Sequence, residues 1–261
     1  ALLRQYAEEK LAEMPELAAQ AHDRQARYFA RFLESTMRRM IGPEQARAFD
    51  AVAEEFDDIA QAWRWWAGRG EFDRLVDQML LPLFRYATGR FVGVDVAPLL
   101  DEAIELRTTN DERRTTNEFV VRSSSFVVPP DPSLAALLIA RAAIYANYFT
   151  QEFAPGDVRA AWALAEAMGE DAPRQLGYWY VTLNLVYGLM EAREPAVANL
   201  RAFVAVIDPA GPTVIDANAA AFARQALARL LIREFAPEAE TLEARALLRE
   251  VRRRYLPDAV V

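Results

Sequence analysis

Side chains that commonly carry catalysis are scarce in this sequence of 261 residues. His22 is the only histidine, Lys10 is the only lysine, and there is no cysteine. A Ser-His-Asp triad or a zinc-water centre would have to be built around His22, which has no patterned partner. A phosphate-binding loop of the form GxxxxGK[ST] needs glycines beside its lysine, and Lys10 has none nearby. We therefore expect no catalytic residue, no metal and no cofactor, and a structural role for His22.

A run of acidic residues, Glu54, Glu55, Asp57 and Asp58, could in principle supply acid–base chemistry or hold a divalent cation. Consecutive residues of a helix point to different faces, so this run does not form a cluster by itself. A solvated helix surface is the favoured interpretation. The tryptophans that follow within ten residues are expected to pack in the interior rather than to form a stacking platform.

The candidate residues for binding a ligand or partner are tyrosines: Tyr145, Tyr148, Tyr180 and Tyr187. Tyr180 and Tyr187 are seven residues apart, so they project from one side of a helix. Tyr145 and Tyr148 on the preceding first helix could extend the same strip. A tyrosine ring offers an apolar surface and a hydroxyl, which suits capture of a peptide or small molecule. The alternative is that the rings pack between helices as core, and the sequence leaves both interpretations open.

Helical periodicity determines where these residues lie. Apolar residues recur at intervals of three and four along nearly the whole chain. From residue 133 onward the helices come in pairs, and the first helices begin near residues 133, 174 and 213. The turns carry Pro155, Pro195 and Pro237, which are 40 and 42 residues apart. A period near 40 with two helices in each unit is typical of an α-solenoid, so the predicted fold is an all-α solenoid of antiparallel helical hairpins.

Four parts are expected along the chain. Residues 1–70 form an N-terminal helical segment, and residues 71–106 form a first repeat-like hairpin. Residues 107–131 are predicted to be an inserted surface loop, because Arg-Thr-Thr-Asn occurs twice in tandem and a Pro-Pro pair follows. Residues 132–261 hold the repeat hairpins and a C-terminal capping helix.

Within these parts, three helices are predicted with specific bounds. One helix is expected from Glu44 to Ala67, ending at the glycines Gly68 and Gly70. A second is expected over Phe72–Tyr86, with a kink at Pro82. A third, over Arg174–Met190, carries Tyr180 and Tyr187.

Charge and composition limit the partners. The net charge of −8 argues against direct contact with nucleic acid, although the last helix carries a short run of arginines. The longest apolar stretch is too short to cross a bilayer and contains Arg141, so no membrane is expected, and the lack of cysteine fits a cytoplasmic location. The sequence starts at Ala1 within an expected helix, which predicts a piece of a longer protein.

Three segments of the first 70 residues resemble a known series. They are Leu2-Leu3-Arg4-Gln5-Tyr6-Ala7, His22 followed by Tyr28-Phe29, and Glu55-Phe56-Asp57-Asp58-Ile59 with Ala62 and Trp65 before Gly68. This series resembles the region of bacterial STAND-class signalling ATPases where the winged-helix part that follows the NB-ARC core gives way to tetratricopeptide-like repeats. The resemblance covers residues 1–106. It implies a tetratricopeptide-like fold and an upstream winged-helix and ATPase core.

The resemblance and the residues together predict a non-catalytic module. The resemblance implies that such a region senses a protein or a small-molecule inducer and acts on the ATPase core in cis, in signalling or in transcription regulation. The ligand would bind in the concave groove and bias the packing of the repeats. The alternative is a free-standing helical-repeat scaffold that bridges protein partners. No residue set supports an enzyme.

Overall fold

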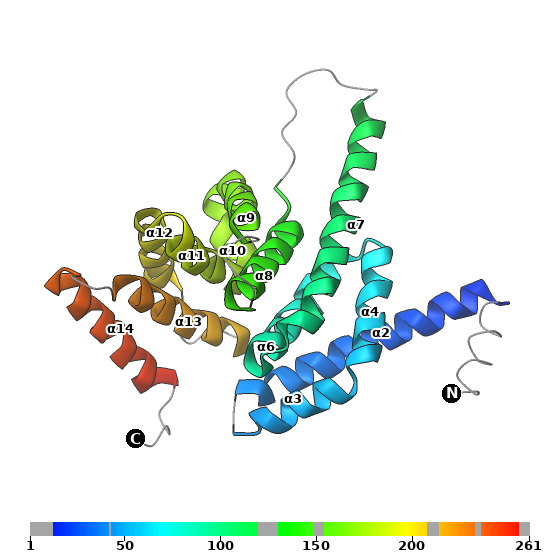
Figure 1. Ribbon diagram of the computed structural model, residues 1–261, viewed down its shortest axis with the longest axis horizontal. Helices are drawn as coiled ribbons and strands as arrows, with labels where there is room; N and C mark the ends of the chain where they lie inside the picture. The colour runs from blue at the N-terminus through cyan, green and yellow to red at the C-terminus, as the bar shows by residue number, and fades with distance from the viewer. Residues whose placement is uncertain are drawn as a thin grey trace. The chain divides into compact units, whose positions relative to one another are not determined.

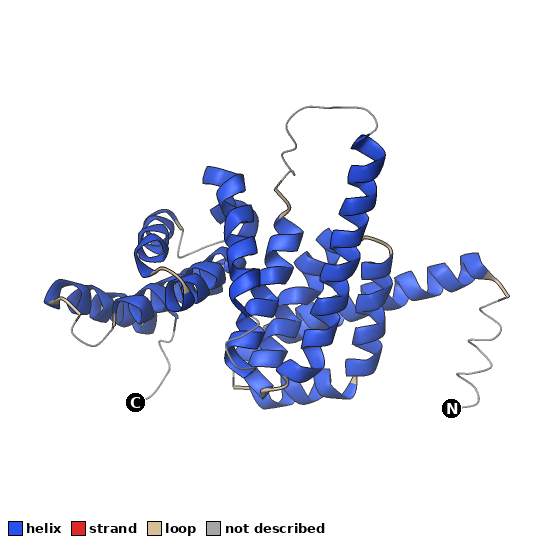
Figure 2. Ribbon diagram, turned by 45° about the horizontal axis from the view of Figure 1, so that its top comes forward, coloured by secondary structure: helices blue, strands red, loops and turns tan. Residues whose placement is uncertain are grey.

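The computed structural model describes residues 13–41, 43–119, 130–148, 154–207, 214–232 and 236–255. Every regular element in these ranges is a helix, which confirms the predicted all-α class (Figures 1 and 2). The chain divides into two compact units, Ala1–Ser125 and Phe126–Val261. Among the described residues, no helix combines the length and the apolar character needed to cross a bilayer.

The first unit is built around α4. Its elements are α2 (Pro15–Met37), η1 (Arg39–Ile41), α3 (Gln45–Glu54), α4 (Phe56–Gly68), α5 (Phe72–Leu75), η2 (Val76–Leu80), α6 (Leu81–Arg90) and α7 (Gly93–Phe119). Helix α4 packs against both α2 and α7. Trp63 is fully buried in this core, and its indole Nε1 donates a hydrogen bond to the carbonyl of Leu99 at 3.0 Å. Trp66 is 1% exposed, so these two tryptophans belong to the interior, as the sequence predicted.

The helix predicted over Glu44–Ala67 is two helices, and that prediction was wrong. The chain turns at Glu55, which ends α3 and begins α4. No glycine or proline marks the break. Helix α3 packs mainly on η1 and α6 and also contacts α2, whereas α4 packs mainly on α2 and α7. A straight helix could not reach both sets of neighbours, so burial of the two apolar faces outweighs continuous helix propensity.

The helix predicted over Phe72–Tyr86 continues to Arg90 and contains a π-helical turn just before Pro82, where a kink was predicted. Elements α5, η2 and α6 follow one another without a break, and η2 is a π-helical turn that ends two residues before Pro82. Proline has no amide hydrogen for the carbonyl four residues earlier, and its ring clashes with that carbonyl. A π-helical turn pairs each carbonyl with the amide five residues later. The chain can therefore bypass the missing donor and remain helical.

The predicted inserted loop at 107–131 was wrong for residues 107–119, which continue helix α7 to Phe119. The hydroxyl of Thr108 donates to the carbonyl of Ile104 at 2.9 Å, and the Arg107 guanidinium lies 5.5 Å from the centre of the Phe72 ring. No glycine or proline occurs between Pro98 and Pro129. Threonine and asparagine cost a helix only about 0.7 kcal/mol each, so they weaken a helix without ending it. Residues 120–129 lie outside the described residues.

The described residues of the second unit are also helical. Its elements are α8 (Pro132–Tyr148), α9 (Ala154–Met168), η3 (Gly169–Asp171), α10 (Ala172–Leu176), α11 (Tyr178–Met190), α12 (Arg193–Val206), α13 (Val214–Leu231) and α14 (Glu238–Tyr255). Three successive pairs pack together: α8 with α9, α11 with α12, and α13 with α14. Helix α11 also packs on α8 and α13, the first helices of the neighbouring pairs. The helix predicted over Arg174–Met190 is interrupted at Gly177, which has a φ of 51°.

Partly buried polar contacts and one close approach at a glycine join these helices. Arg141 of α8 binds Asp157 of α9 through two hydrogen bonds of 2.7 Å. Arg193, at the start of α12, donates to the carbonyl of Leu230 at 2.8 Å and to the Glu240 carboxylate of α14 at 2.5 Å. At Gly188, an added Cβ would lie only 2.8 Å from a methyl group of Leu230. Helix α11 therefore approaches α13 as closely as a glycine allows.

Candidate functional site

A cavity of about 280 Å³ lies in the second unit, where α9, α11 and α12 meet. Its walls come from α9, η3 and α10 on one side and from α11 and α12 on the other. We call it the aromatic groove; its lining residues are Trp162, Ala165, Glu166, Gly169, Ala172, Tyr180, Leu183, Asn184, Pro195 and Asn199. One of the four tyrosines that the sequence predicted, Tyr180, is among them.

Helix α11 is buried on all sides, and this burial fixes the position of Tyr180. Its residues from Tyr178 to Leu185 are all buried, which is typical of a helix surrounded by others. The Tyr180 ring is 9% exposed and lies 5.7 Å from the ring of Phe203 on α12. Burial raises the pKa of the Tyr180 phenol, and the Asn184 side chain partly opposes that rise. Tyr180 is therefore both a core residue and a wall of the groove.

Asn184 is the polar residue at the floor of the groove. It is fully buried, and its Nδ2 donates to the backbone carbonyl of Tyr180 at 2.8 Å. Its Oδ1 accepts no hydrogen bond from the described residues. A buried acceptor without a donor costs about 1–3 kcal/mol. A hydrogen-bond donor that enters the groove would remove that cost.

Tyr187 and Trp162 form a stacked pair beside the groove. Their ring centres are 3.8 Å apart and their planes differ by 15°. The Trp162 indole also donates from Nε1 to Oε1 of Glu166 at 2.8 Å. Tyr187 therefore holds the aromatic wall formed by Trp162, and Trp162 in turn orients the exposed carboxylate of Glu166.

The four predicted tyrosines have different surroundings. Tyr180 lines the groove, and Tyr187 packs on a residue that lines it. Tyr145, on α8, is partly exposed and is not among the lining residues. The side chain of Tyr148 lies outside the described residues. The groove also differs from the predicted site because the second helices α9 and α12 supply much of its wall.

The sequence prediction missed Trp162, Glu166, Asn184 and Asn199. One signal could have pointed to Asn184: it is the only amide side chain in the otherwise apolar segment Tyr178–Met190. A polar residue at a core position of a helix usually has a hydrogen-bonding reason to be there. Trp162 carries no such signal, because an aromatic residue on a helix usually packs in the core.

The other candidates from the sequence belong to the first unit. The His22 ring lies 4.8 Å from the ring of Trp65, at an angle of 33°. In the acidic run, Asp58 accepts a hydrogen bond of 3.5 Å from Gln25. The described part of the chain contains no group of three or more histidine, aspartate or glutamate side chains arranged to hold a metal ion.

The chemistry of the aromatic groove is that of a binding site for hydrogen-bond donors. Asn184 offers an unused acceptor at the floor, and Glu166 offers a carboxylate at the rim. Trp162, Tyr180 and Leu183 offer apolar surface between them. A ligand with a flat apolar body and an amine or amide N–H fits this arrangement. No model of a protein family, no curated protein and no solved structure matches the chain.

Proposed function

We propose that this chain is a non-catalytic sensor module that binds a protein segment or small molecule in the aromatic groove. The observation that carries the proposal is the groove itself, which joins a buried unused acceptor, Asn184 Oδ1, to an aromatic wall. A groove of this kind recognises the N–H groups of its ligand and excludes water from them. The module would belong to a larger bacterial signalling ATPase or transcription regulator.

We further propose that α8 to α14 form a tetratricopeptide-like solenoid of antiparallel hairpins. Two features support this. The helices pack as consecutive pairs, and the first helices α8, α11 and α13 pack on one another in series. The Arg193 contacts to Leu230 and Glu240 connect one pair to the next in the same way. Each hairpin of a solenoid buries its apolar face only by stacking on its neighbours.

The location of the groove suggests how binding would be transmitted. Trp162 and Glu166 belong to α9 of one pair, whereas Tyr180, Asn184 and Asn199 belong to α11 and α12 of the next. A ligand that contacts both pairs binds most tightly when the two walls are close enough to touch it together. Its binding therefore increases the population of that packing arrangement. The repeats would pass that shift to an ATPase core in the same polypeptide.

The groove can be tested with three probes of similar shape. Phenethylamine has an ammonium group, N-acetylphenethylamine has a neutral N–H donor, and phenylacetate has only acceptors. We expect calorimetric titration of the full chain to rank their affinities in that order. Glu166→Gln should weaken the ammonium probe by about tenfold, because a charged hydrogen bond contributes about 1.5–3 kcal/mol. The exposed neighbour Glu170→Gln is the matched control. Equal binding of phenylacetate, or equal losses in both variants, would contradict the proposal.

The link to an ATPase has its own test, the sequence of the coding region immediately before Ala1. A GxxxxGK[ST] motif followed by a winged-helix segment in the same reading frame is expected. A stop codon or an unrelated domain there would instead favour a free-standing scaffold that bridges protein partners, while the result for the groove would stand.

A further inference from the structure

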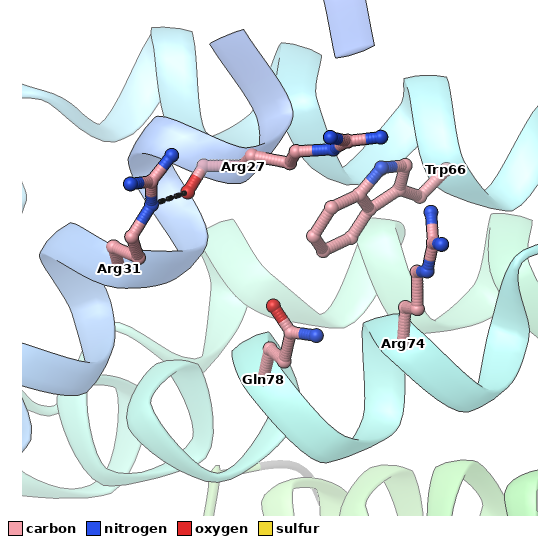
Figure 3. Close-up of a pocket in the computed structure, with 5 residues that line it drawn as sticks. All are labelled: Arg27, Arg31, Trp66, Arg74 and Gln78. Atoms are coloured by element: carbon pink, nitrogen blue, oxygen red, sulfur yellow. Dashed lines mark hydrogen bonds between the residues drawn. The ribbon is translucent and has the colours of Figure 1, made fainter. Parts of the chain in front are cut away.

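A second cavity, in the first unit, is lined by hydrogen-bond donors. It has a volume of about 300 Å³, and its lining residues are Arg27, Arg31, Trp66, Arg74 and Gln78. They come from α2, α4, α5 and the π-helical turn η2. In Figure 3, the side chains of Arg27, Arg74 and Gln78 lie around the indole of Trp66. None of the five lining residues is acidic, in a chain whose net charge is −8.

The indole of Trp66 provides an independent sign of a missing acceptor. Trp66 is 1% exposed, and its Nε1 has no hydrogen-bond partner among the described residues. The indole N–H can only donate. Nearby, the N–H of Trp63 donates to the carbonyl of Leu99, whereas Trp65 Nε1, like Trp66 Nε1, has no partner among the described residues. Of the two unpartnered indoles, Trp66 is the one that lines the cavity.

The arginines are only partly neutralised by the protein. Arg27 pairs with Asp23 at 2.6 Å, and Arg74 approaches Glu71 at 3.4 Å. Arg31 donates from Nε to the carbonyl of Arg27 at 3.2 Å and forms no ion pair with the described carboxylates. A guanidinium has five N–H donors, so a single carboxylate leaves several of them free for a ligand.

A neighbouring cavity of about 350 Å³ widens the basic surface. Its lining shares Arg27 and Arg74 with the first cavity, and it adds Arg69. Asp23 and Glu71 also line it, which places both carboxylates beside the first cavity rather than in its lining. The donor-lined cavity thus keeps its positive character although acidic residues are close.

We infer that the cavity at Arg27, Trp66, Arg74 and Gln78 binds the phosphoryl group of a small molecule, as free phosphate or as a phosphate monoester. The donors come from three directions, since α2, α4 and α5–η2 each contribute. A tetrahedral phosphoryl group has three peripheral oxygens that can accept from several directions at once, whereas a planar carboxylate suits a single arginine fork. The volume is at the lower end for ligand pockets, which fits a small ester.

Calorimetric titration of the full chain at constant ionic strength tests this inference. Glycerol 3-phosphate and inorganic phosphate are the two phosphoryl probes, and their ratio tells whether the ester or the free ion is preferred. Glycerate, which has a carboxylate, and glycerol, which has no charge, are the comparison probes. Saturable binding of a phosphoryl probe, stronger than that of glycerate, is expected. No saturation by about 10 mM of either phosphoryl probe, or equal binding of glycerate, overturns the inference.

Substitutions test whether binding depends on the arginines that line the cavity or only on general attraction of anions to a basic surface. Arg74→Gln should weaken binding by about tenfold, and Arg27→Gln with Arg74→Gln should abolish it. Arg24→Gln makes the same charge change at an exposed residue of α2 that does not line the cavity, and should change affinity less than twofold. Equal losses in Arg24→Gln and Arg74→Gln overturn the inference.

The indole N–H signals in a ¹H–¹⁵N spectrum of the folded wild-type chain give a second measurement. The Trp66 signal should move downfield on titration with glycerol 3-phosphate, because its N–H gains an acceptor. The Trp162 signal should not move, because Trp162 lies in the other unit. An unmoved Trp66 signal at saturation overturns the inference.

Discussion

The Tyr187 ring lies flat against the Trp162 indole, with 3.8 Å between the ring centres. Tyr187 is on α11 and Trp162 is on α9, so the contact joins the second helix of one pair to the first helix of the next. The same indole holds Glu166 through its N–H. Packing and the proposed ligand recognition therefore both involve Trp162.

The stacking energy can be measured with a double-mutant cycle. Tyr187→Ala, Trp162→Ala and the double variant should show a coupling of about 1 kcal/mol in the free energy of unfolding, the usual size for an aromatic pair. Urea denaturation supplies the values. Leu189→Ala, at an exposed position of the same helix, should show no coupling to Trp162→Ala. A coupling close to zero for Tyr187 would mean that the rings pack without specific attraction.

The stability of Tyr180 variants tests whether this side chain is part of the core. Tyr180→Ala removes a ring that is 9% exposed and should cost about 3 kcal/mol or more. Tyr180→Phe keeps the ring and should cost much less, about 1 kcal/mol. Thermal or urea unfolding checks both values. A loss below about 0.5 kcal/mol for Tyr180→Ala would show that the side chain is not core.

Gly188→Ala should destabilise the second unit by about 1–3 kcal/mol, because the new methyl group would lie 2.8 Å from Leu230 Cδ1 and 2.9 Å from Ala196 Cβ. Gly156→Ala is the matched control. Gly156 lies in α9 and has nothing within 4 Å of an added Cβ. The control should be neutral or should stabilise the helix by up to about 1 kcal/mol. Similar unfolding midpoints for the two variants would contradict the close approach of α11 to α13.

The ion pair between Arg201 and Glu243 should make the attachment of α14 sensitive to acid. Arg201 donates two hydrogen bonds, of 2.9 and 2.6 Å, and holds the pKa of the Glu243 carboxyl below its ordinary value of 4.5. A pKa that is lower in the folded state stabilises the fold above pH 4.5, and the stabilisation is lost as the pH falls through the folded value.

Urea unfolding of the wild type and of Glu243→Gln across this pH range checks the expectation. At pH 7 the variant should be less stable by about 0.5 kcal/mol, since the pair is partly exposed, and the difference should shrink below pH 4.5. Glu238→Gln, at the start of the same helix, controls for a general charge effect. A difference that is constant with pH would show that Glu243 acts through packing and not through its charge.

Some helix ends in the second unit were predictable because strong local signals mark them. Proline at the first helical position and a preceding aspartate begin α8, where the Asp131 carboxylate accepts from the amides of Ser133 and Leu134 at 3.0 and 3.1 Å. The predicted starts near 133 and 213 fall close to Pro132 and Val214, whereas the start near 174 matches the short helix α10 at Ala172 and not α11, which begins at Tyr178. Glycine and proline act within a few residues, so they can be recognised without knowing the fold.

Features that depend on distant neighbours were not predictable. The turn at Glu55 lets α3 and α4 pack on largely different neighbours, and the sequence around it contains no helix breaker. The continuation of α7 past Arg107 depends partly on Phe72, which is 35 residues earlier. Both cavities combine residues from separate helices. Periodicity found the face that holds Tyr180, but it could not show that Trp162 and Asn184 share the same cavity.

The contacts of Arg193 restrict where this chain can be truncated or exchanged with a segment of another protein. Arg193 is the first residue of α12, yet its guanidinium is bound by the last turn of α13 and by Glu240 of α14. A fragment that stops after Val206 would keep the cation and lose both acceptors, along with Leu230, which packs against Gly188. Swapping in a hairpin from another protein would require a carboxylate and a free carbonyl at the same two places. Fragment boundaries for expression or domain exchange are therefore better placed before Pro132 than between the later pairs.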